Sequence, residues 1–86
     1  MAVRVTIEAR DREAAEVVAR HLGPDARAAS WRGLGVIRVK AQDAAETARI
    51  VDLVSGLLER HHDLGWLRVR YDDEYRVFRA NGRRTA

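Results

Sequence analysis

The fold of this chain is built around the sequence DAAETARIVDLVSGLLERHH, which runs from Asp43 to His62. Apolar residues recur in it every three or four positions, the period of a helix with one buried side. Asp43 and Glu46 have the spacing of a capping box, in which Asp43 accepts from the N3 amide and Glu46 reaches back to the N-cap amide. The stretch therefore predicts a capped helix whose apolar side closes the core. The residues of the predicted apolar side are Ala48, Ile50, Val51, Leu53, Val54, Leu57, Leu58 and His61.

Segments on both sides of this helix have the pattern of strands. Apolar and polar residues alternate over residues 3–10, 36–41 and 66–71, the period of two expected of a strand with one buried face. Two further strands are predicted, a short one within residues 25–31 and one over residues 75–80. The chain therefore supplies enough strands for a sheet that the long helix can cover.

A shorter helix and a hairpin turn are predicted between the first and second of the alternating segments. Asp11 is a suitable N-cap, and Gly23 followed by Pro24 ends a helix, since Pro cannot continue the hydrogen-bond ladder. The turn Arg32-Gly33-Leu34-Gly35 contains two glycines that can take positive φ, which predicts a tight hairpin.

The acidic run Asp72-Asp73-Glu74 predicts a second hairpin, whose register the sequence leaves open. A loop of two residues places Phe78 on the same face as Val69. A loop of three residues pairs Tyr75 with Tyr71 and Val77 with Val69 instead.

The order of elements resembles the ferredoxin-like βαββαβ arrangement, an α+β fold with two helices on one face of an antiparallel sheet. Here a C-terminal β-hairpin extension follows the last strand. We expect a single domain over residues 1–80 and a flexible basic tail over residues 81–86. The resemblance names no function, because this fold carries many unrelated ones.

Composition excludes several classes of site. The 86 residues include no cysteine, so disulfides, thiolate metal sites and cysteine nucleophiles are excluded. No apolar run reaches the 18 or so residues that span a bilayer, and the N-terminus has no signal-peptide pattern, so we expect a cytoplasmic protein without membrane contact. A domain of this size has one modest core and little room for a deep pocket. We expect a protein that is not an enzyme and that binds no cofactor.

The histidines and acidic residues do not form a recognisable site in the sequence. His61 and His62 are adjacent, so on a helix their side chains diverge by about 100° and do not readily share a metal ion. His21 has the same place near the end of its own helix, where a cation favours the helix dipole. Ser30 and Ser55 lack the Gly-x-Ser-x-Gly pattern of a nucleophile. We therefore predict neither a metal site nor catalytic residues.

The predicted strands leave one face of the sheet uncovered, and this face carries five cations and one acidic residue. Trp31 joins it if the register of the second strand allows. The residues expected there are Arg4, Thr6, Glu8, Val36, Arg38, Lys40, Trp66, Arg68 and Arg70.

Three interpretations of this face compete. Trp, Val and Arg are typical of protein interfaces, which favours a regulatory or interaction domain that contacts another protein or a second copy of itself through the open face or an edge strand. The same Arg and Trp residues could instead bind single-stranded nucleic acid, although the central strands lack the aromatic residues of RNA-recognition domains. The third interpretation is a solvated face in an Arg-rich protein. The candidate binding residues are Arg4, Val36, Arg38, Lys40, Trp66, Arg68 and Arg70.

Overall fold

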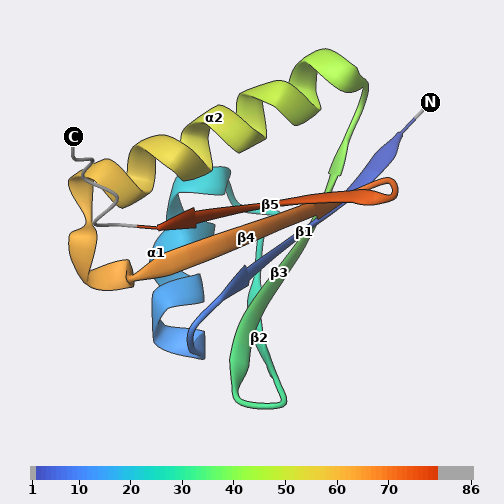
Figure 1. Cartoon of the computed structure of the whole chain (residues 1–86). Helices are drawn as coiled ribbons and strands as arrows, with labels where there is room; N and C mark the ends of the chain where they lie inside the picture. The colour runs from blue at the N-terminus through green and yellow to red at the C-terminus, as the bar shows by residue number, and fades with distance from the viewer. Residues whose placement is uncertain (1, 80–86) are drawn as a thin grey trace.

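The computed structural model describes residues 2–79 and has an α+β architecture, a five-stranded antiparallel sheet with two helices (Figure 1). The strand order is β2-β3-β1-β4-β5, so β1 lies in the centre and β2 and β5 form the edges. The predicted tail at 81–86 and the last residue of the predicted final strand lie outside the described residues. The elements are β1 (Val3–Ala9), α1 (Arg12–Leu22), β2 (Ala28–Trp31), β3 (Leu34–Ala41), α2 (Ala44–Arg60), the 3-10 turn η1 (His62–Leu64), β4 (Trp66–Tyr71) and β5 (Glu74–Arg79).

Both helices pack on the same face of the sheet, α1 against β1, β2 and β3, and α2 against β1, β3, β4 and β5 (Figure 1). The strands direct their alternate residues into the space between sheet and helices, where the core lies. The largest fully buried side chains are Val5, Ile7, Val18, Ile37, Val54, Leu57, Leu67 and Val69.

Helix α2 begins as predicted and ends earlier than predicted. The Asp43 side chain accepts a hydrogen bond from the Glu46 amide at 2.9 Å. The Glu46 carboxylate, however, accepts from the amide of Gln42, not from that of Asp43. The prediction that the helix includes His62 is wrong, because the chain leaves the helix after Arg60 and forms η1. This turn brings Leu64 into the core before β4 starts.

The buried side of α2 also differs from the prediction at one position. Thr47 is buried and Ala48 is exposed. The Thr47 hydroxyl donates to the carbonyl of Asp43 at 3.1 Å, so this polar side chain is satisfied within the first turn of its own helix. Val54, Leu57 and Leu58 are buried as predicted.

Of the two glycines of the first hairpin, Gly33 takes the predicted positive φ and Gly35 has a different role. The loop consists of Arg32 and Gly33 alone, with φ of 52° and 83°, the positive values of a tight two-residue turn. Gly35 lies inside β3, where a Cβ atom would stand 2.2 Å from the carbonyl oxygen of Asp11 and 2.6 Å from Cβ of Ala15. The reason for a glycine at 35 is therefore the close approach of α1, and positive φ is needed only at 32 and 33.

The second hairpin has the two-residue loop, the first of the two registers that the sequence allowed. Tyr71 pairs with Glu74 across Asp72 and Asp73, and Leu67 pairs with Phe78. Phe78 packs against the core on the helix side. Strand β5 therefore directs the alternate residues Tyr75, Val77 and Arg79 to the uncovered face of the sheet.

No helix within residues 2–79 is long and apolar enough to cross a membrane.

Candidate interaction surface

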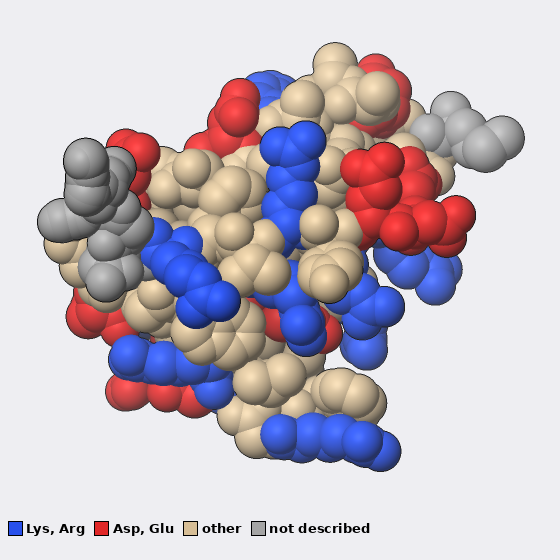
Figure 2. Space-filling view, in the orientation of Figure 1, with Lys and Arg blue, Asp and Glu red and all other residues tan. Residues whose placement is uncertain are grey.

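The face of the sheet that the helices leave uncovered, the open face, collects side chains from all five strands. Residues that pair directly across antiparallel strands point to the same side, so the register defines its members. Figure 2 shows Lys and Arg side chains gathered over the strands, with an acidic group at the β4–β5 hairpin. The open face consists of Ala29, Trp31, Arg4, Thr6, Glu8, Leu34, Val36, Arg38, Lys40, Trp66, Arg68, Arg70, Tyr75, Val77 and Arg79.

All seven of the predicted binding residues lie on this face, but two of the predicted cations are not free. Glu8 is only 4 % exposed, although it lies on the uncovered side. Its carboxylate forms a short ion pair and hydrogen bond with Arg68, and it also lies 3.7 Å from Nη1 of Arg70. The centre of the face therefore has one carboxylate against two guanidinium groups and keeps one excess positive charge. Arg4, Arg38 and Lys40 add further positive charge on the β1–β3 side.

This ion-paired centre was not predicted from the sequence. The alternation of β1 and β4 placed Glu8, Arg68 and Arg70 on one face but did not give the register between strands separated by 60 positions. In the structure Glu8 lies directly opposite Arg68 on one side and Val36 on the other. Val36 also lies on this face, but its side chain is buried. It is therefore not the exposed contact residue that we expected.

Trp31 does join the open face. It pairs with Leu34 at the β2 edge and lines a shallow groove of about 320 Å³ together with Arg4, Arg38 and Arg70. The guanidinium of Arg32 lies 4.9 Å from the centre of the indole ring. A cation stacked on an exposed ring restricts the motion of the ring. The side chain therefore loses less conformational entropy when a partner binds it.

Strand β5 contributes the part of the open face that sequence reasoning did not assign. Tyr75 and Val77 alternate with Arg76 and Phe78, and only the two-residue loop directs Tyr75 and Val77 away from the helices. The Arg68 guanidinium lies 5.9 Å from the centre of the Tyr75 ring. The ion-paired Arg68 therefore connects the centre of the open face to its β5 edge.

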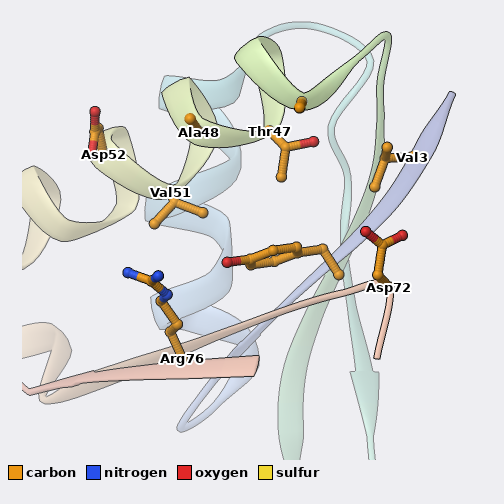
Figure 3. A pocket seen from close by; sticks show the side chains of 9 residues that line it. Val3, Thr47, Ala48, Val51, Asp52, Asp72 and Arg76 are labelled. Atoms are coloured by element: carbon orange, nitrogen blue, oxygen red, sulfur yellow. The ribbon is translucent and has the colours of Figure 1, made fainter. Parts of the chain in front are cut away.

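A second hollow lies on the helix side, between the first half of α2 and the β4–β5 hairpin. It has a volume of about 290 Å³ and a mainly apolar wall that includes Val3, Ala48 and Val51. In Figure 3 Arg76 approaches Val51 from below, and Asp52 points away from the hollow. Its volume is at the lower end for small-molecule pockets, and it opens widely to solvent. The hollow offers space for an apolar side chain more readily than for an enclosed substrate.

The histidines meet at the ends of the two helices. The rings of His21 and His61 lie 5.7 Å apart, and Nδ1 of His21 is 2.9 Å from the carbonyl of Val17. Within residues 2–79, no group of three or more His, Cys, Asp or Glu side chains has the arrangement of a metal site.

Comparison with family models, with curated proteins and with solved structures finds no match for this chain. Its function is therefore argued from the geometry of the open face.

Proposed function

We propose that this chain is a small non-catalytic interaction domain that associates with another protein, in the simplest case a second copy of itself, through the open face and the edge strand that borders it. The observation that carries this proposal is where the exposed large hydrophobic residues lie. Within the described part of the chain these are Trp31, Tyr75 and Val77, exposed by 52 %, 62 % and 45 %. All three belong to the open face.

The chemistry of these residues suits a protein partner. Trp, Tyr and Arg are the residue types that most often dominate interface energetics. Burying about 100 Å² of each aromatic ring would contribute roughly 2.5 kcal/mol per ring before the entropic cost of association. Cations already lie over both rings, Arg32 over Trp31 and Arg68 over Tyr75.

The ion pair at the centre supports the same proposal. An unpaired charge in an interface must lose its hydration without compensation, which is costly. Because Glu8 already pairs with Arg68 and lies 3.7 Å from Arg70, a partner that covers the centre of the face has to compensate one excess positive charge and not three separate charges. The remaining cations, Arg4, Arg38 and Lys40, would then select an acidic rim on the partner.

We also infer that the first four strands and both helices have the ferredoxin-like βαββαβ arrangement, to which β5 adds a fifth strand. The order of elements and the central position of β1 and β3 support this inference. It places the proposed surface on the side of the sheet that this arrangement leaves without helices.

Sedimentation velocity over about 10 μM to 1 mM would test self-association, a range chosen because small interfaces give weak dimers. We expect the mean sedimentation coefficient to rise with concentration and the rise to diminish in Tyr75→Ala. Arg49→Ala is the matched control, since Arg49 is exposed on α2, on the opposite side of the sheet. A chain that stays monomeric over the whole range would overturn self-association.

A second function, binding of single-stranded nucleic acid, is favoured by one observation. Trp31 shares its groove with Arg4, Arg38 and Arg70, which combines a ring for stacking with cations for phosphate. Asp72 and Glu8 line the same groove and oppose a polyanion. Affinity for a single-stranded oligonucleotide that falls steeply with salt and is lost in Arg38→Glu would establish this function. A partly apolar protein interface would depend far less on salt.

A further inference from the structure

The edge of the sheet formed by β5 is long and open. Within residues 2–79, strand β5 is the last strand in the sheet order and pairs with β4 alone. Exposed edge strands offer unpaired amide and carbonyl groups to another strand, and proteins commonly block them with short length, proline, bulges or inward charges. The other edge is β2, which has only four residues, whereas β5 has six.

We propose that two copies of this chain join along β5, antiparallel about a two-fold axis at Val77, so that their sheets form one continuous ten-stranded sheet. This inference rests on the proposed self-association and names the surface and register that carry it. The two open faces would then lie on the same side and form a single broad surface.

The hairpin determines which backbone groups are available. In a two-residue loop the flanking residues, here Tyr71 and Glu74, are the hydrogen-bonded pair of the turn. Because hydrogen-bonded and non-hydrogen-bonded positions alternate along an antiparallel ladder, Glu74, Arg76 and Phe78 direct their backbone groups towards β4. The residues whose amide and carbonyl groups point outward are therefore Tyr75, Val77 and Arg79. They are the same residues whose side chains lie on the open face.

The side chains select the register. A two-fold axis perpendicular to the sheet pairs residues of the same face, and centring it on Val77 pairs Val77 with its own copy. Tyr75 of each copy then lies opposite Arg79 of the other copy, so each ring meets a cation. All three outward-pointing residues find hydrogen-bonding partners in this register.

Neighbouring registers are less complementary. Centring the axis on Arg76 places two guanidinium groups directly opposite each other, and like charges in that position destabilise a sheet. Centring it on Tyr75 places Val77 opposite the turn residue Asp73 of the second copy and leaves the outward groups of Arg79 without a strand to pair with. Of these three registers, only the Val77 register combines an apolar centre, unlike neighbours and a full ladder.

Cysteine cross-linking tests this register directly, because the chain has no cysteine of its own. In the proposed dimer the two Cα atoms at position 77 are a hydrogen-bonded pair about 5.5 Å apart, within the range of a disulfide. Val77→Cys should therefore form a disulfide-linked dimer under mild oxidation. Tyr75→Cys is the matched control. In this register position 75 lies opposite position 79 of the second copy, so the two residues at position 75 are about 13 Å apart along the strands.

The outcomes separate this proposal from the proposed function. Efficient cross-linking at 77 with little at 75 supports the Val77 register. Equal or faster cross-linking at 75 overturns it. A wild-type chain that dimerises in sedimentation while Val77→Cys does not cross-link also overturns it, although self-association stands. A wild-type chain that remains monomeric overturns both.

A proline variant gives a second, independent measurement. The Val77 amide points away from β4, so Val77→Pro removes a donor of the proposed interface without removing one from the β4–β5 ladder. Loss of its two symmetry-related hydrogen bonds should weaken dimerisation about tenfold or more. Circular dichroism should show that the variant retains its fold. Unchanged dimerisation in a folded Val77→Pro chain would contradict the β5 interface.

Discussion

The two faces of the sheet are built from the same strands and reach burial by different means. On the helix side, β1 places Val5 and Ile7 in the apolar core, where neither is exposed. On the open side the same strand places Glu8, which is buried by the arginines of β4. The alternation of a strand therefore separates two tasks: one face provides stability, and the other can carry charge and exposed rings at little cost to folding. Substitutions on the two faces should differ accordingly.

The largest effect is expected from Leu57→Asp on the helix side. Leu57 is fully buried between α2 and the sheet, and an aspartate there would be charged without a partner. Leucine-to-alanine changes in cores already cost about 2–5 kcal/mol, so the aspartate variant should be unfolded at 25 °C. Circular dichroism with urea titration would measure this. His61→Ala, at the end of the same helix, is the control and should cost little; a folded Leu57→Asp chain would show that α2 does not close the core.

A smaller but still large effect is expected from Gly35→Ala in β3. The added Cβ would stand 2.2 Å from the carbonyl oxygen of Asp11, which is backbone and cannot swing away. Helix α1 must move, and we expect a loss of about 3 kcal/mol in the free energy of unfolding. Gly56→Ala is the control, because its nearest neighbour is Nη1 of Arg60 at 3.5 Å and the site is helical. That variant should gain about 0.5–1 kcal/mol.

These two substitutions also show how far the sequence predicts the structure. The period and capping residues of α2 predicted its position and its burial of Leu57, because both are local properties of the helix. The role of Gly35 could not be predicted, since it depends on the approach of α1 from a distant part of the chain. The sequence identified a glycine-rich hairpin but assigned to Gly35 a positive φ that only Arg32 and Gly33 adopt.

The open face shows the same limit. Alternation alone placed the candidate residues on one side of the sheet, including Arg38 and Trp66. It did not show that Glu8 neutralises Arg68, because that pairing depends on the register between β1 and β4. It also left Tyr75 unassigned, since a difference of one residue in the hairpin loop moves it to the other face.

An intermediate effect is expected from Glu8→Ala on the open face. The substitution leaves Arg68 and Arg70 close together without the carboxylate that joins them. Because both arginines remain partly in solvent, we expect a loss of about 1–2 kcal/mol, less than for a fully buried pair. Glu16→Ala is the control, since its pair with Arg12 is exposed on α1 and should be worth no more than about 0.5 kcal/mol.

A double-mutant cycle would show whether the Glu8 effect comes from the ion pair. If Glu8 and Arg68 interact as the structure indicates, Glu8→Ala should cost about 1 kcal/mol less in an Arg68→Ala background than in the wild type. A coupling energy near zero would mean that the carboxylate does not stabilise the face through Arg68, which leaves its contact with Arg70 or packing. Either result would be read from urea unfolding midpoints at constant ionic strength.

The smallest effect on stability is expected from Trp31→Ala at the β2 edge. About half of the residue is in solvent, and Arg32, whose guanidinium lies over the indole ring, is also exposed. The free energy of unfolding should change by no more than about 0.5 kcal/mol. In a dimer joined along β5, Trp31 lies at the opposite edge of the sheet, so self-association should be unaltered. Weaker association would mean that a partner covers the open face at β2, because an exposed ring contributes area only when the partner covers it. If Trp31→Ala lowers stability and leaves association unaltered, the indole serves folding, as the residues on the helix side do. Unaltered stability with weaker association would show that the two faces have separate tasks even at the edge of the sheet.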